Sequence, residues 1–498
     1  MEEKNFIEKN KTLLALFCFS SLLLMLIGSL VGKGIFSNIP QNFLVILDKQ
    51  ANGMLYFFYH DVIPVNFSNR LLALPYNILI PLFDKSPFVM INLYAFSCSF
   101  ATLAATLMNF FFANRTKKSE YAALALMFYA FFAIAAFLYP IDTTYISIPM
   151  FFILLQYFFT EEELSKFDYS AVAVISFYML QSSANMVIPC IILSFTGFII
   201  LAKEKLKNNE IKNWKVKLFL AFSSALAAFY MVYKTFFYED DKSYICPSFE
   251  ECIFTFKTAL ISTFDKFLTS DMMFSTIALI FIICALVKNK IPHKKEGIIA
   301  TFVALFVIYS IYEFTNFHRN PFIAQKYFAL TTIALIIVTL VISIINISGK
   351  KFGNKEVFCN SIISVACFCG IIQCMIQYGQ CIDFGRYTDY IKCKVKENVG
   401  VIKIPVEDYK NKSYLVYDSC NSTVLRSLMV SDFEVKSLIV PNQNFYKNDK
   451  ACIGYNDVSH ANDEDNQFII IQDEYFSGKN YYWKFRDIAT LMAKAKLK

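Results

Sequence analysis

Charged residues are scarce in this chain, since Asp, Glu, Lys and Arg together make up 17% of its 498 residues. Soluble domains contain about a quarter charged residues, so this composition argues against a water-soluble protein. Histidine is rarer still, with four residues and no metal-ligand spacing among them. The sequence also lacks Walker A, G-x-G-x-x-G and H-E-x-x-H patterns, which argues against an ATPase, a dehydrogenase and a zinc protease.

Hydrophobic residues make up 56% of the sequence and gather in long runs. Runs near twenty residues are long enough to cross the hydrocarbon core of a bilayer as helices. The sequence therefore predicts a polytopic α-helical membrane protein with about eleven transmembrane helices, the first of them retained rather than cleaved as a signal. The eleven runs are 12–32, 86–113, 120–139, 144–160, 168–185, 187–203, 217–237, 272–288, 297–313, 327–348 and 357–377. The segment Leu71–Phe83 holds two prolines and is too short to span, so we interpret it as re-entrant or interfacial.

The loops between these runs alternate in charge. Loops of one set are acidic or poor in charge, namely Pro140–Thr143, Glu239–Asp271 and Phe314–Lys326. Loops of the other set are basic, and carry Lys4, Lys9 and Lys11; Arg115, Lys117 and Lys118; Lys203, Lys205, Lys207, Lys212, Lys215 and Lys217; Lys288, Lys290, Lys294 and Lys295; and Lys350, Lys351 and Lys355. Because basic loops stay in the cytoplasm, we expect a multi-pass protein of a bacterial inner membrane with a cytoplasmic N-terminus and a periplasmic C-terminal part. The net charge of +7 then reports topology, and no nucleic-acid partner is expected.

Six of the fourteen cysteines fall outside the apolar runs, and all six lie on the predicted outer side. They are Cys246, Cys252, Cys381, Cys393, Cys420 and Cys452. An even number of cysteines in an oxidising compartment favours disulfides. Cys246 and Cys252 are the candidate pair, the pairing of the last four stays open, and six free thiols are the alternative.

The composition changes at residue 378, so we divide the chain into a transmembrane domain, 1–377, and an extracytoplasmic domain, 378–498. Short β-rich runs separated by Asn, Asp, Gly and Lys predict strands at Val399–Ile404, Tyr414–Tyr417, Val435–Val440 and Phe468–Ile471. Helices are expected at Gly385–Glu397 and Trp483–Lys498. This pattern predicts a small mixed α/β domain that binds a ligand or caps the membrane part.

The first outer loop, 33–72, is long and brings ionisable residues close to lipid: Asp48, His60, Asp61 and Arg70. Ionisable groups at membrane depth are costly and therefore mark functional candidates. A carboxylate beside an apolar interface has a raised pKa, because burial disfavours its charge. Such a group can accept a proton from a hydroxyl near neutral pH.

A later outer loop, Tyr312–Tyr327, supplies cations on the same predicted side, with His318, Arg319 and Lys326. Cationic side chains can hold a departing phosphate, and Arg does so in a bidentate manner. Together the two loops suit the transfer of a group from a lipid-linked phosphate donor.

The long first outer loop with its Asp residues, the span number and the extracytoplasmic tail resemble the GT-C superfamily of integral membrane glycosyltransferases. The resemblance implies a polyprenyl-phosphate sugar as donor, a cell-surface glycan or lipid-linked acceptor, and a catalytic carboxylate in the first outer loop. That carboxylate would be Asp48 or Asp61, with His60 beside it. Tyr59-His60-Asp61 stands where the superfamily carries D-x-D or E-x-D.

Other interpretations of these residues stay open. Asp48 could instead be a charged residue on the surface of an interfacial helix. His60 and Asp61 could form a turn before Pro64, and Arg70 could anchor the chain at the lipid headgroups. A divalent metal ion could bind the acidic cluster Glu239–Asp241, although three adjacent acids cannot all face one ion and solvation is the simpler role. An envelope glycan polymerase or acyltransferase shares the predicted topology. A transporter or flippase predicts charged residues within the spans and internal repeats, neither of which we find.

Overall fold

The structure is a computed structural model that describes residues 5–31, 87–134, 143–180, 182, 186–206, 212–233, 324–347, 355–397, 400–404, 438–439 and 468–472. The helices in these ranges are α1 (Asn5–Val31), α4 (Pro87–Thr116), α5 (Ser119–Phe128), the π-helical turn η3 (Tyr129–Ala133), α6 (Thr143–Phe159), α7 (Lys166–Leu180), α8 (Val187–Leu206), α9 (Trp214–Tyr233), α13 (Ala324–Ile347) and α14 (Lys355–Glu397). The strands are β1 (Gly400–Ile404), β2 (Leu438–Ile439) and β3 (Phe468–Gln472).

Each described helix coincides with a predicted apolar run, which confirms the helical membrane-protein class. Within the described ranges, four helical segments are long and apolar enough to cross a membrane: Asn10–Gly28, Val187–Leu206, Trp214–Tyr233 and Lys355–Gly379. Shorter apolar helices lie at Ser119–Ala133, Tyr145–Phe159 and Ala334–Ile347. The runs 272–288 and 297–313 lie outside the described residues, so the number of eleven crossings stays a prediction.

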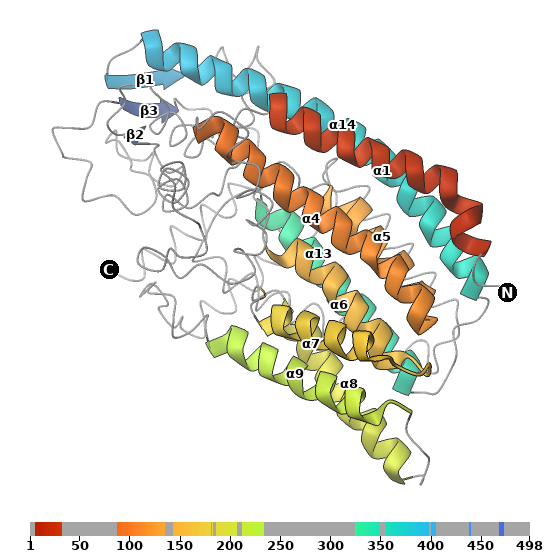
Figure 1. Ribbon diagram of the computed structural model, residues 1–498. Coiled ribbons are helices and arrows are strands. Elements are labelled where there is room, and N and C mark those ends of the chain that lie inside the picture. Colours follow the sequence, from red (N-terminus) through yellow and green to blue (C-terminus); the bar gives the residue numbers. More distant parts are fainter. Residues whose placement is uncertain are drawn as a thin grey trace, which may run out of the picture.

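Two long helices from opposite parts of the chain, α1 and α14, lie side by side and run parallel (Figure 1). The Asn10 amide donates to Asn360 Oδ1 at 2.9 Å near the start of both helices. Farther along, Ser21 Oγ lies 3.9 Å from Cys374 Sγ. The bundle is therefore closed by segments about 350 residues apart in sequence.

The described helix ends that adjoin predicted cytoplasmic loops meet at one end of the bundle, which we call the basic end. Polar contacts tie these loops and helix ends to one another there. Lys355 Nζ lies 3.1 Å from Glu120 Oε2, Lys203 Nζ donates to Ile347 O at 2.6 Å, and Asn213 Nδ2 donates to Glu162 O at 2.7 Å. The helices thus alternate in direction as the loop charges predict. Which membrane face meets the basic end stays a prediction.

The other ends of three helices point away from the basic end. They are Val31 of α1, Pro87 of α4 and Ala324 of α13. These helices are 27, 30 and 24 residues long, so at 1.5 Å per residue their two ends are at least about 35 Å apart. We call this second side of the bundle the opposite end.

Side chains on the outside of the helices are large and apolar. Among those more than half exposed are Phe19, Val174, Phe195, Phe222, Phe229, Phe368 and Met375. Many large apolar side chains exposed in this way are unfavourable in water and typical of contact with lipid. The pattern agrees with the membrane class.

The extended tail of α14 joins the membrane part to a small sheet. α14 has 43 residues and continues past its apolar segment, which ends at Gly379, as far as Glu397. The predicted helix Gly385–Glu397 is therefore the end of this longer helix, which runs through the domain boundary placed at residue 378. β1 follows three residues later, and the sheet is parallel with the order β1-β3-β2.

Three of the four predicted strands coincide with described strands. The fourth, Tyr414–Tyr417, and the predicted helix Trp483–Lys498 lie outside the described residues, so the α/β domain as a whole stays a prediction.

Close packing of α1, α14 and η3 depends on a glycine. The Phe17 ring is fully buried and packs edge-on against Tyr129, with ring centroids 5.9 Å apart. A Cβ added at Gly370 would lie 2.3 Å from Phe17 Cε2 and 3.0 Å from Ala130 Cβ. Any larger residue at this position must therefore displace the ring.

We expect Gly370→Ala to destabilise the protein by about 1–3 kcal/mol, because overpacking forces neighbouring side chains off their preferred rotamers. Gly379→Ala on the same helix is the matched control, since a Cβ there meets no atom within 4 Å. Thermal unfolding in detergent should show a lower Tm for Gly370→Ala and an unchanged or slightly higher Tm for Gly379→Ala. Equal Tm values for the two variants would contradict the packing argument.

Candidate functional site

Most of the residues predicted to form the site lie outside the described residues. They are Asp48, His60, Asp61, Arg70, His318 and Arg319, together with the disulfide candidates Cys246 and Cys252 and the acidic cluster Glu239–Asp241. Lys326 is described for its backbone alone, which belongs to the first turn of α13. The position of its side chain is not described. The catalytic assignments therefore stay predictions.

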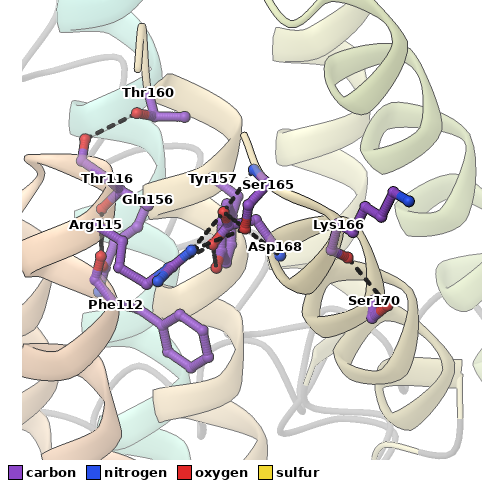
Figure 2. A network of polar contacts seen from close by, with 10 residues as sticks. All are labelled: Phe112, Arg115, Thr116, Gln156, Tyr157, Thr160, Ser165, Lys166, Asp168 and Ser170. Carbon is purple, nitrogen blue, oxygen red and sulfur yellow. Dashed lines mark hydrogen bonds and ion pairs between the residues drawn. The ribbon is translucent and has the colours of Figure 1, made fainter. Parts of the chain in front are cut away.

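The described residues contain a different polar cluster, at the basic end, in which three side chains surround one carboxylate (Figure 2). We call Arg115, Tyr157, Ser165 and Asp168 the Asp168 cluster. The side chain of Asp168 is only 4% exposed. Arg115 Nε and Nη2 donate to its two oxygens at 2.7 and 2.9 Å, and the Tyr157 hydroxyl donates at 2.8 Å. α4, α6 and α7 each contribute to the cluster.

The local sequence explains why Asp168 lies in this position. Ser165 precedes the first residue of α7, and its backbone N–H and hydroxyl donate to Asp168 Oδ2 at 2.8 and 2.6 Å. The Asp168 N–H points back to Ser165 Oγ at 3.4 Å. This reciprocal arrangement is a capping box, in which each side chain satisfies a free N–H group at the start of a helix. The same carboxylate therefore begins α7 and holds α4.

Arg115 lies at the end of α4, beyond the predicted apolar run 86–113. Its guanidinium lies 5.1 Å from the centroid of the Phe167 ring, and Nη2 also donates to Ser165 Oγ at 2.8 Å. The hydrogen bond to Asp168 raises the pKa of Arg115 above its usual value, so the side chain stays charged. Planar bidentate contact of this kind is specific to Arg and is not reproduced by Lys.

The geometry of the Asp168 cluster indicates a structural role rather than a catalytic one. Five hydrogen bonds reach the two oxygens of Asp168, and a carboxylate offers about four lone-pair directions. No acceptor capacity is left for a substrate proton, which a general base requires.

A second polar group, deeper in the bundle, joins α4 to α6. Gln156 Nε2 donates to Asn109 Oδ1 at 3.0 Å, and Asn109 Nδ2 donates to Pro149 O at 3.0 Å. The Thr160 hydroxyl donates to Thr116 O at 2.8 Å and so satisfies a carbonyl at the end of α4. Interhelical hydrogen bonds of this kind stabilise helix packing in membranes.

Metal binding finds no support in the described part of the chain. Within the ranges given above, no group of three or more His, Cys, Asp or Glu side chains lies close enough to hold a metal ion. Cys393, one of the cysteines predicted on the outer side, is an exposed free thiol.

Sequence reasoning missed the Asp168 cluster, although one signal for it was present. Ser165-Lys166-Phe167-Asp168 has capping-box spacing directly before an apolar run. Arg115 is fifty-three residues away from Asp168 in sequence, and no local pattern connects the two.

Comparison of the chain with protein-family models, with curated proteins and with solved structures finds no match. The resemblance to the GT-C superfamily therefore stays a prediction.

We expect Asp168→Asn to destabilise the protein by about 2 kcal/mol, because the amide loses the charge of the acceptor and turns a donor toward Arg115. Ser165→Ala should cost about 1 kcal/mol through loss of the helix cap. The double variant should cost less than the sum, since both changes remove the Ser165–Asp168 bonds.

Ser170→Ala is the control for this series, because Ser170 is exposed and its hydroxyl donates only to its own helix at Lys166 O among the bonds described. Its unfolding free energy should stay within about 0.5 kcal/mol of the wild type. Additive effects of Ser165→Ala and Asp168→Asn in thermal unfolding would show that the capping box does not couple them.

Proposed function

We propose that this protein is a membrane glycosyltransferase that transfers a sugar from a polyprenyl-phosphate donor to a cell-surface glycan or a lipid-linked acceptor. The reaction would take place at the outer face of a bacterial inner membrane. The residues assigned to it are Asp48 or Asp61 as base, with His60 beside them, and Arg70, His318, Arg319 and Lys326 as phosphate-binding groups.

One observation carries the proposal. Val31, Pro87 and Ala324 all lie at the opposite end of the bundle. Val31 and Pro87 flank the segment that contains Asp48 and Asp61, and Ala324 follows His318 and Arg319 by a few residues. This arrangement supports the proposal, because the described helix ends that adjoin the two predicted loops lie on the same side of the bundle, as the proposed reaction requires.

In the proposed reaction the carboxylate accepts the proton of an acceptor hydroxyl. The hydroxyl oxygen forms a bond to the anomeric carbon of the sugar, and the bond from that carbon to the phosphate oxygen breaks. The polyprenyl phosphate leaves with its added negative charge, which the Arg and Lys side chains stabilise. The reaction written in this way needs no metal ion. If a metal ion takes part, Glu239–Asp241 are a candidate site.

A glycan polymerase or acyltransferase of the envelope is a second candidate, because it requires the same topology and differs in its donor. Transport is a weaker candidate. Transporters bind substrate near the bilayer midplane through polar or broken helices, and the polar groups described in the interior of α4 and α6 are engaged with each other.

Asp48→Asn and Asp61→Asn, made one at a time, should identify the base. We expect one of them to lower glycan product by about a hundredfold or more, since general-base catalysis contributes factors of that size. The measurement is the surface glycan profile of cells that lack the chromosomal copy and express each variant at equal membrane levels.

Glu163→Gln is the control for this experiment. Glu163 is exposed at the basic end and belongs to no group assigned to the reaction. Its product should equal that of the wild type. Full product from both Asp variants would refute the carboxylate assignment. Movement of a lipid-linked substrate across reconstituted vesicles without any covalent product would favour the transporter.

A further inference from the structure

The buried face of α14 becomes polar toward the opposite end of the bundle. Near the basic end this face is apolar or small, with Cys359, Ile363 and Ala366 no more than 1% exposed. Gln373 and Gln377 continue the same spacing of three and four residues at 4% and 0% exposure. Both lie within the apolar segment Lys355–Gly379, which is long enough to cross a membrane.

Gln377 differs from Gln156, another fully buried amide, in its hydrogen bonding. Neither Nε2 nor Oε1 of Gln377 has a hydrogen-bond partner in the structure as described. Gln156 is also 0% exposed, but its amide donates to Asn109 and its Oε1 lies 3.2 Å from the Thr116 hydroxyl. A buried amide without partners opposes folding, because it loses its bonds to water and gains none in return.

The hydroxyls of Ser176, Thr332 and Ser343 are also buried without a partner, but a buried hydroxyl in a helix can find an acceptor more easily than a buried amide. A Ser or Thr hydroxyl in a helix has the carbonyl one turn earlier within reach. A carboxamide at the end of the longer Gln side chain depends on a partner from another segment or molecule. Gln377 therefore marks a place where a polar group from outside the described residues is expected.

The position of Gln377 connects it to the proposed reaction. It lies one turn beyond Cys374, which contacts Ser21 of α1. From Ser21, α1 continues for ten residues to Val31, where the segment carrying Asp48 and Asp61 begins. Because α1 and α14 run parallel, Gln377 lies in the half of the bundle nearer the opposite end, where α1 ends.

We propose that Gln377 is a substrate-binding residue whose amide bonds to two neighbouring hydroxyl groups of a sugar ring in the substrate. This inference rests on the proposed glycosyltransferase function and adds to it the group that orients the sugar. A carboxamide holds one acceptor and two donor positions in a plane, and adjacent hydroxyls can each donate and accept. A fully ionised phosphate offers acceptors alone and would leave Oε1 unsatisfied, so the chemistry favours the sugar over the phosphate.

The inference predicts opposite effects on stability and on activity. Gln377→Leu removes a buried amide that makes no described bond, so we expect Tm to rise by about 2 °C. The same variant should lower glycan product by roughly tenfold or more at equal protein level, because the sugar loses two hydrogen bonds. Gln156→Leu is the matched control, and there Tm should fall, because Asn109 and Thr116 lose their partner.

The following results would contradict the inference. A Tm of Gln377→Leu below that of the wild type would show that the amide has a partner within the folded chain. Full glycan product from this variant would show that it does not orient the substrate. If Asp48→Asn or Asp61→Asn abolishes product while Gln377→Leu keeps it, the inference on Gln377 fails and the proposed function stands. If both Asp variants and Gln377→Leu keep full product, the assigned site itself is wrong.

Discussion

A bundle of helices surrounded by lipid contains no water to satisfy its internal polar groups, so these groups must bond to each other. This constraint organises the part of the chain that the structure describes. Asn109 and Gln156 join α4 to α6, and Asp168 collects donors from α4, α6 and the turn before α7. Each contact also fixes which helix ends lie together. The direction of the helices therefore follows from hydrogen bonding as much as from apolar packing.

The same constraint separates structural polar residues from candidates for function. Asp168 is saturated with donors, and its contribution is to hold three helices in register at the basic end. Gln377 is equally buried, but its amide has no hydrogen-bond partner among the described residues. Proteins retain locally unfavourable groups mainly where function requires them. The hydrogen bonds around a buried polar residue are thus more informative about its role than its burial.

Apolar runs and loop charges predicted much of the fold from sequence. The runs anticipated every described helix, because about twenty apolar residues in succession have few alternatives to a membrane helix. The end of α14 was less predictable. The run ends at residue 377, but the helix continues through Tyr378 and Gly385 to Glu397, since extending an existing helix is far easier than starting a new one. β1 and β3 were anticipated from their β-branched residues, whereas their parallel pairing depends on contacts that no local pattern encodes.

The continuation of α14 has a mechanical consequence for the sheet. From Gly379 to Glu397 the helix extends for about 27 Å at 1.5 Å per residue, and β1 begins three residues after it. The helix therefore acts as a lever arm whose first part, Lys355–Gly379, is packed against α1 and η3. A tilt of about 5° at the packed side would displace the far end by roughly 2 Å over this length. Small rearrangements around Phe17 and Gly370 would thus be magnified at the strands.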